Sequence, residues 1–185
     1  MAPARAPQKS MVIALLPVWG ALVGAVGAQL LERGTPVWVV LLAWIVCTRL
    51  EQRVLRLSNW YLLASALAAG VWWAAAPVAM GPAVTAHAAG RAAMISLAWI
   101  SRPAASGSPL PVTTWGACAA IGVGGLVIFA ARPIRPAVAV LAVACLVVRL
   151  VREWSYRRNG GVGQVDLAVA KGVTEVSIVV LLRLL

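Results

Sequence analysis

Three groups of charged residues have the types and spacing needed to bind a phosphate-bearing ligand. In the first group, His87 and Arg91 are four residues apart and share one face of a predicted helix, with Arg102 at the end of the same apolar stretch. A guanidinium in this setting can hold a phosphate or pyrophosphate through two parallel hydrogen bonds. The alternative is that Arg91 pairs with a carboxylate or with backbone carbonyls inside a helix bundle.

The second group is a glycine-rich turn with charged residues on both sides. It contains Arg157, Arg158, Gly160, Gly161, Gly163, Asp166, Lys171 and Glu175. Backbone N–H groups at a glycine-rich helix start can hold an anion, and the two arginines would add to the attraction. The alternative is a loop followed by a capped helix, in which Asp166 complements the helix dipole and Lys171 pairs with Glu175.

The third group repeats arginines at near-helical spacing. Arg49, Arg53 and Arg56 surround Glu51, and this pattern is typical of a basic face that lies near anionic lipid headgroups. The alternative is electrostatic capture of an anionic substrate.

The elements that must position these groups are membrane helices. Of 185 residues, 62% are hydrophobic and 11% are charged, so the apolar content exceeds what one soluble core of this size needs. The excess is expected to face lipid, which excludes a secreted globule or a disordered chain. The 16 basic residues are spread among short breaks, so nucleic-acid binding is not expected. The five acidic residues disfavour a metal site built from several carboxylates.

Uncharged stretches separated by short polar or Gly/Pro-bearing breaks predict an all-α, polytopic integral membrane bundle with about six or seven transmembrane segments. A basic cytoplasmic tail over residues 1–10 precedes one membrane-embedded domain over residues 11–185. The predicted segments are 11–31, 36–50, 60–80, 83–100, 112–131, 134–151 and 165–185. Segment 36–50 is short for a crossing, and residues 60–100 fit either one hairpin or two half-buried helices.

The distribution of basic residues predicts a multi-pass protein of the cell (inner) membrane with a cytoplasmic N-terminus. With seven crossings, ten basic residues fall inside, namely Arg5, Lys9, Arg49, Arg53, Arg56, Arg102, Arg149, Arg152, Arg157 and Arg158. Four fall outside, namely Arg33, Arg132, Arg135 and Arg183. Tryptophans near segment ends, including Trp60, Trp99, Trp115 and Trp154, are expected to anchor at the membrane interfaces.

The three cysteines have neither the spacing nor the neighbours of a metal site. Cys47, Cys118 and Cys145 each lie in an apolar run, so we expect free, buried thiols rather than a zinc site or disulfides.

Three stretches of the chain resemble membrane-embedded cobalamin synthases (adenosylcobinamide-GDP ribazoletransferases). The run GGVGQVDLAVAKGVTEVSIVVLL is similar to the family's last helix, AAGRAAMISLAWISRP to its arginine-bearing helix, and ALLPVWGALVGAVGAQL to its first span. Together they cover about half the chain, in the family's order. Where the family has an Asp-rich segment introduced by a histidine, this chain has VCTRLEQRVLRLSNW, and Asp166 is displaced by one position, with Val165 in its place.

The resemblance implies a transferase that joins α-ribazole to adenosylcobinamide-GDP at the membrane, late in cobalamin biosynthesis. It implies catalytic roles for Arg91 and Arg102, which would hold the pyrophosphate, and a Mg²⁺ ion held by Asp166 and Glu175. The substrate-binding residues would be Gly160, Gly161, Gly163, Arg157 and Arg158. The implied partners are the bilayer and an anionic nucleotide-type small molecule, and a homo-oligomer or partner subunit stays open.

The missing Asp-rich segment leaves a second interpretation open. The chain can be a non-catalytic, shortened relative that acts as a membrane scaffold or partner subunit. A small transporter is a third interpretation, which the few intramembrane ionisable groups disfavour.

Overall fold

The computed structural model describes residues 6–75, 79–104 and 110–185, and these form seven helices. The helices are α1 (Ala6–Glu32), α2 (Val37–Leu55), α3 (Asn59–Ala75), α4 (Met80–Ile100), α5 (Thr114–Ala131), α6 (Ile134–Asn159) and α7 (Gln164–Leu184). The described residues contain no strand, and Pro103 and Val162 form one isolated backbone pairing. The all-helical prediction is therefore confirmed.

The seven helices follow the seven predicted segments, and the largest differences are at helix ends. Helix α1 begins at Ala6, inside the predicted tail of residues 1–10, and residues 1–5, with Arg5, lie outside the described part. Helix α6 continues to Asn159, eight residues beyond the predicted segment, because the polar residues after Leu150 are still good helix formers. Residues 60–100 form two separate helices, α3 and α4.

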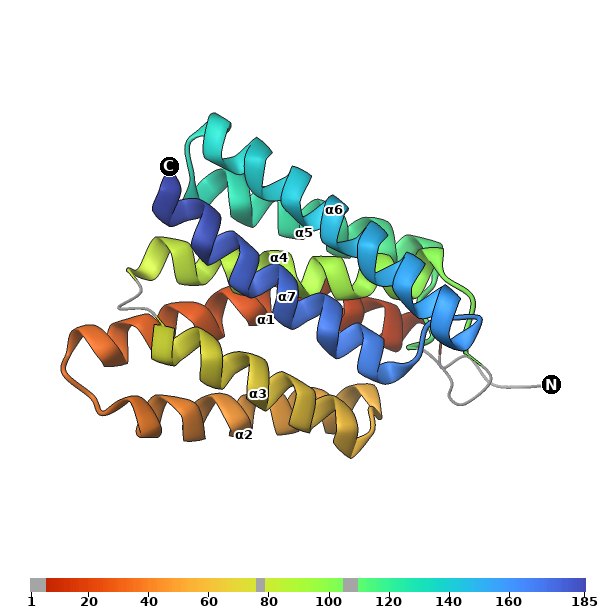
Figure 1. Ribbon diagram of the computed structural model, residues 1–185, viewed down its shortest axis with the longest axis horizontal. Coiled ribbons are helices and arrows are strands. Elements are labelled where there is room, and N and C mark those ends of the chain that lie inside the picture. The colour runs from red at the N-terminus through yellow and green to blue at the C-terminus, as the bar shows by residue number, and fades with distance from the viewer. Residues whose placement is uncertain (1–5, 76–78, 105–109) are drawn as a thin grey trace.

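Successive helices run in opposite directions, so the connections alternate between the two ends of the bundle (Figure 1). The α2–α3, α4–α5 and α6–α7 connections lie at one end, which we call the N-terminal end because α1 starts there. The other end contains the α1–α2 and α5–α6 connections and the C-terminus. Three helices, α1, α5 and α6, are long and apolar enough to cross a membrane.

Helix α4 lies at the centre of the bundle and contacts α1, α5, α6 and α7. Small residues allow this arrangement, because backbones can approach closely where no side chain intervenes. A Cβ at Gly24 of α1 would lie 2.6 Å from the Ala83 carbonyl oxygen of α4, and a Cβ at Gly90 of α4 would lie 2.6 Å from Cγ of Glu175 on α7. These glycines allow α1 and α7 to pack closely on α4.

The hydrophobic core has two parts along this central helix. One is built around Ile95, Leu97 and Leu167, and the other around Ala86, Ile128 and Ile178. Many large apolar side chains on α1, α5 and α6 remain exposed, including Leu22, Leu126 and Leu146. An apolar interior combined with exposed apolar side chains is compatible with a helix bundle in a membrane.

Candidate functional sites

Six polar side chains from four helices meet in the centre of the bundle, and we call them the inner cluster. They are Glu51 (α2), Tyr61 (α3), His87 and Arg91 (α4), and Lys171 and Glu175 (α7). All are almost completely buried; Arg91, for example, is 0% exposed and Glu175 is 2% exposed.

Arg91 forms ion pairs with both glutamates of the inner cluster. Its Nη2 lies 2.9 Å from Oε2 of Glu51, and its Nη1 lies 3.6 Å from Oε1 of Glu175. Nδ1 of His87 lies 2.9 Å from the same Glu175 oxygen. Lys171 Nζ approaches Oε2 of Glu51 at 3.6 Å. Two carboxylates therefore face two basic side chains, Arg91 and Lys171, and opposite charges are paired in the interior.

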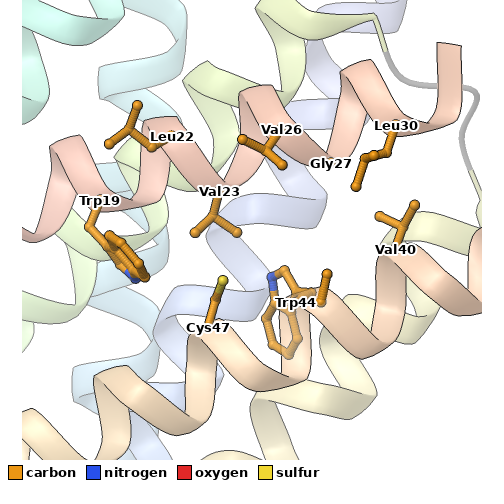
Figure 2. Close-up of a pocket in the computed structure, with 10 residues that line it drawn as sticks. Trp19, Leu22, Val23, Val26, Gly27, Leu30, Val40, Trp44 and Cys47 are labelled. Carbon is orange, nitrogen blue, oxygen red and sulfur yellow. The ribbon is translucent and has the colours of Figure 1, made fainter. Parts of the chain in front are cut away.

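Two aromatic residues complete the surroundings of these charges. The Tyr61 hydroxyl donates a hydrogen bond of 2.7 Å to Oε1 of Glu51 and accepts one of 3.3 Å from Lys171 Nζ. The Lys171 ammonium lies 5.3 Å from the centre of the Trp44 ring, a distance suited to a cation–π contact. Trp44 also lines an apolar cavity of about 130 Å³ between α1 and α2, where Cys47 faces α1 (Figure 2). The Trp44 ring thus contacts the buried Lys171 ammonium and also lines the apolar cavity.

The glycine-rich turn predicted to bind substrate lies at the N-terminal end of the bundle, where it is fixed to the segment after α4. The Val162 N–H donates to the Arg102 carbonyl (2.9 Å), and the Ala104 N–H donates to the Val162 carbonyl (3.0 Å). A Cβ at Gly161 would lie 2.6 Å from the Pro103 carbonyl oxygen, so only glycine fits there. Gly160 ends α6 with a φ of 66°, a conformation that favours glycine. Both glycines thus have a structural task that is independent of any ligand.

Asp166 caps the helix that the turn introduces. Its Oδ2 accepts a 2.7 Å hydrogen bond from the Gly163 N–H, and its carboxylate sits in the first turn of α7, where it suits the helix dipole. The capped-helix interpretation of Asp166 therefore agrees with its contacts. Lys171 forms its ion pair with Glu51 of α2, while Glu175, four residues along the same helix, contacts His87 and Arg91.

The turn and the cap form part of an open cavity of about 460 Å³, which we call the end pocket. It is lined by Ser58, Trp60, Trp154, Arg158, Asn159, Gly163, Gln164, Val165 and Asp166. The Arg158 guanidinium lies 5.4 Å from the centre of the Trp154 ring, and Trp60 is largely exposed. The end pocket therefore combines one cation, one carboxylate and two exposed aromatic side chains.

The remaining arginines of the prediction lie near this pocket but do not line it. Arg102 is exposed, and its backbone N–H donates to the Tyr156 hydroxyl at 2.7 Å. Arg157 is exposed and pairs with Glu153 one turn earlier on α6. In the third group, Arg49 donates to the side chains of Gln52 and Asn59, while Arg53 and Arg56 are exposed.

The predicted site residues are thus divided between two places. Arg91 and Glu175 belong to the inner cluster, whereas Gly163, Arg158 and Asp166 line the end pocket. Asp166 and Glu175 are nine residues apart on one helix, which corresponds to about 13 Å along its axis at 1.5 Å per residue. The structure does not bring the predicted catalytic, substrate-binding and metal residues together in one cavity.

Asp166 and Glu175 do not fit a shared Mg²⁺ ion. Ligands of one Mg²⁺ lie about 2.1 Å from it, which a separation of this size does not allow. Each carboxylate is also engaged already, Asp166 by the Gly163 N–H and Glu175 by His87 and Arg91. Within the part of the chain that is described, no group of three or more His, Cys, Asp or Glu side chains is placed to hold a metal ion. The cysteines are free thiols, and Cys118 and Cys145 are exposed rather than buried as predicted.

Sequence reasoning missed two features of these sites. Glu51 appears in the sequence as one acid among arginines, and nothing in its spacing marks it as the partner of Arg91, 40 residues away. Trp60 and Trp154 were expected only as interfacial anchors, but they also line the end pocket.

Comparison of the chain with known proteins found no matching family model, no similar curated protein and no similar solved structure.

Proposed function

We propose that the protein is a multi-pass membrane protein with a cytoplasmic N-terminus and six or seven crossings. Support comes from the alternation of helix direction and from three helices that are long and apolar enough to cross. Basic residues are also unequal between the ends. Eight described arginines lie toward the N-terminal end, namely Arg49, Arg53, Arg56, Arg102, Arg149, Arg152, Arg157 and Arg158, against Arg33, Arg132, Arg135 and Arg183 at the other.

The charges of α4 and α7 are compatible with crossing. An isolated charge in a membrane helix costs about 2.5–3.5 kcal/mol on insertion scales. Arg91, Lys171 and Glu175 face the interior and compensate one another, so α4 and α7 need not expose charge to lipid.

The function we propose is that of a cobalamin-synthase-like protein whose end pocket binds the nucleotide-type substrate, adenosylcobinamide-GDP. The observation that carries this proposal is the position of Arg158, Gly163 and Asp166. The resemblance associates Arg158 and Gly163 with substrate and Asp166 with Mg²⁺, and all three line one cavity together with Trp60 and Trp154. A guanidinium suits a phosphate oxygen, and indole faces suit stacking on a nucleobase. A volume of about 460 Å³ falls within the ordinary range for small-molecule pockets.

Binding of GDP by purified protein in detergent tests this proposal. We expect saturable quenching of tryptophan fluorescence, because Trp60 and Trp154 line the pocket, and we expect Trp154→Leu to reduce it. Trp115→Leu, at an exposed tryptophan on α5 that does not line the pocket, is the matched control. Absence of saturable quenching, or equal behaviour of the two variants, would contradict the proposal.

Transfer of α-ribazole to adenosylcobinamide-GDP is the reaction we propose from the resemblance. The residues of this chain can bind and orient the nucleotide, but Asp166 and Glu175 do not form a Mg²⁺ site, so we derive no metal-dependent step. An assay with purified protein, Mg²⁺ and both substrates tests the reaction directly. Formation of adenosylcobalamin would support the proposed reaction. A lack of product would show that this chain does not catalyse the reaction on its own.

One observation favours the second candidate, a non-catalytic relative that serves as a scaffold or partner subunit. Both Arg91 and Glu175 are fully buried and paired with each other and with Glu51 or His87, so neither is available to a substrate. Restoration of transferase activity on adding a second protein that supplies clustered carboxylates would distinguish a shared active site from a scaffold. Solute uptake by proteoliposomes would instead indicate a transporter.

A further inference from the structure

A third cavity, separate from the inner cluster and the end pocket, lies between α4, α5 and α6. It has a volume of about 450 Å³, and its lining includes Ala92 and Ser96 from α4, Gly125 from α5 and Leu141 from α6. We call it the α4–α5–α6 groove. Most of its lining is apolar, and the small residues of α4 and α5 leave room between the helices.

The groove is open toward the outer surface of the bundle. A Cβ added at Gly125 would meet no atom within 4 Å, so the space in front of this glycine is empty. Large apolar side chains on the same two helices are exposed, with Leu126 at 72% and Leu146 at 55%. Helices α5 and α6 are two of the three that are apolar and long enough to cross a membrane. The occupant must therefore be compatible with a hydrocarbon environment.

One end of this apolar groove carries positive charge. Arg149 and Arg152, three residues apart on α6, complete its lining near Ile100 at the end of α4. Both arginines are exposed, and in the described residues neither forms an ion pair with a carboxylate. Arg152 lies over the Tyr156 ring at 5.0 Å. An apolar channel that ends in two arginines is complementary to a molecule with an apolar tail and an anionic head.

We infer that the α4–α5–α6 groove binds an anionic phospholipid, with one acyl chain between the helices and the phosphate at Arg149 and Arg152. This inference rests on the proposed membrane location but not on nucleotide binding in the end pocket. Tyr156 and Trp99 lie toward the same end of the bundle, where aromatic side chains mark the level of headgroups.

A second copy of the chain is a poorer partner for this groove, because it has few carboxylates to offer the arginines. Of the five acidic residues, Glu51, Asp166 and Glu175 are buried and Glu153 is paired with Arg157. Of the two exposed acids, only Glu32, at the other end of the bundle, is outside an ion pair among the described residues. A lipid phosphate supplies the missing negative charge at the right level of the membrane.

Retention of lipid by detergent-solubilised protein, followed by native mass spectrometry, tests the inference. Dioleoyl phosphatidylglycerol and dioleoyl phosphatidylcholine have the same tails and differ in headgroup charge. We expect one phosphatidylglycerol to be retained in preference to phosphatidylcholine. Arg149→Gln with Arg152→Gln should weaken this retention by about 30-fold, which corresponds to about 1 kcal/mol for each arginine. Arg33→Gln with Arg183→Gln removes the same charge from exposed arginines at the other end of the bundle and should leave retention unchanged.

A pair of glycines on α5 tests the position of the acyl chain. Gly122 and Gly125 both have open space in front of them, but only Gly125 lines the groove. Gly125→Leu should abolish preferential retention while the folded protein remains, and Gly122→Leu should leave it intact. Equal effects of the two variants, equal retention of the two lipids, or a dimer that forms in place of the lipid complex would each overturn the inference. Inorganic phosphate at the same concentration should not compete, because it has no tail for the groove.

Discussion

The inner cluster and the end pocket both contain arginine and carboxylate side chains and both use helix α7, yet their surroundings are opposite. In the inner cluster, Arg91 is 0% exposed and its charge is satisfied by two glutamates. In the end pocket, Arg158 is exposed and contacts an aromatic ring. Removing one partner of a buried ion pair is strongly destabilising, whereas an exposed guanidinium next to open space can exchange its water for a ligand. In this protein, burial of the side chain, more than residue type, therefore distinguishes a charge that belongs to the fold from one that can bind a ligand.

The largest effect is expected from removing the central cation of the inner cluster. Arg91→Met leaves Glu51 and Glu175 buried without their main partner, so the free energy of unfolding should fall by about 3–5 kcal/mol. Thermal unfolding in detergent measures the loss, and Arg158→Met in the end pocket is the control. If Arg91→Met unfolds at the wild-type temperature, the cluster is not the stabilising network described here.

A compensating variant sharpens this result. Arg91→Met combined with Glu51→Met removes one charge of each sign and leaves Lys171 and Glu175 in the core. Because replacing a buried pair by apolar side chains is often neutral, the double variant should regain part of the stability lost in the single variant. No recovery would indicate that hydrogen bonds to Tyr61, rather than charge balance, dominate.

A smaller loss is expected where α4 meets α7. In Gly90→Ala, the new Cβ would lie 2.6 Å from Cγ of Glu175 and 3.0 Å from the Lys171 carbonyl oxygen. Overpacking of this kind costs about 1–3 kcal/mol, measured as a fall in the unfolding temperature. Gly122→Ala, which meets no atom within 4 Å, should be neutral or slightly stabilising because alanine favours helix. Equal effects at the two glycines would show that α4 and α7 are not in close contact.

The helix cap beside the end pocket should matter less. Asp166→Ala removes the acceptor for the Gly163 N–H, and loss of such a cap costs about 1 kcal/mol. Asp166→Asn keeps an acceptor and should retain most of the wild-type unfolding temperature. If Asp166→Asn lowers the unfolding temperature as much as Asp166→Ala, the negative charge of Asp166, rather than its hydrogen bond, stabilises the helix.

The smallest effect is expected on the surface of α6. Arg157 and Glu153 form an ion pair with side chains that are 79% and 51% exposed, and exposed pairs contribute about 0–1 kcal/mol. Arg157→Gln should therefore unfold within a degree or two of wild type, with Arg53→Gln as a second exposed arginine for comparison. A large destabilisation would mean that the α6 end packs against something in the membrane or in a partner.

The helices could be predicted from the sequence, but the pairing of their charges could not. Apolar runs between Gly/Pro breaks predicted seven segments, because the length and composition of an apolar run indicate a membrane helix. The partner of Arg91 was not predictable, because Glu51 lies 40 residues away. It reaches Arg91 only because α2 packs on α1 and α3, which in turn contact α4 and α7. The i, i+4 spacing predicted that Lys171 pairs with Glu175, but in the folded protein Glu51 of α2 forms an ion pair with Lys171. In contrast, Gly163 and Asp166 were predictable, since a cap depends only on neighbours in sequence.

The central claim is that the end pocket binds a nucleotide-type anion while the inner cluster stabilises the fold. The most direct test is to measure both the dissociation constant for GDP and the unfolding temperature of the same variants. Arg158→Gln should weaken binding at least about tenfold, as expected for a lost charge-assisted contact, without changing the unfolding temperature. Arg91→Lys should lower the unfolding temperature without changing the dissociation constant, because the folded protein keeps its end pocket. Weaker binding in Arg91→Lys and unchanged binding in Arg158→Gln would contradict the account.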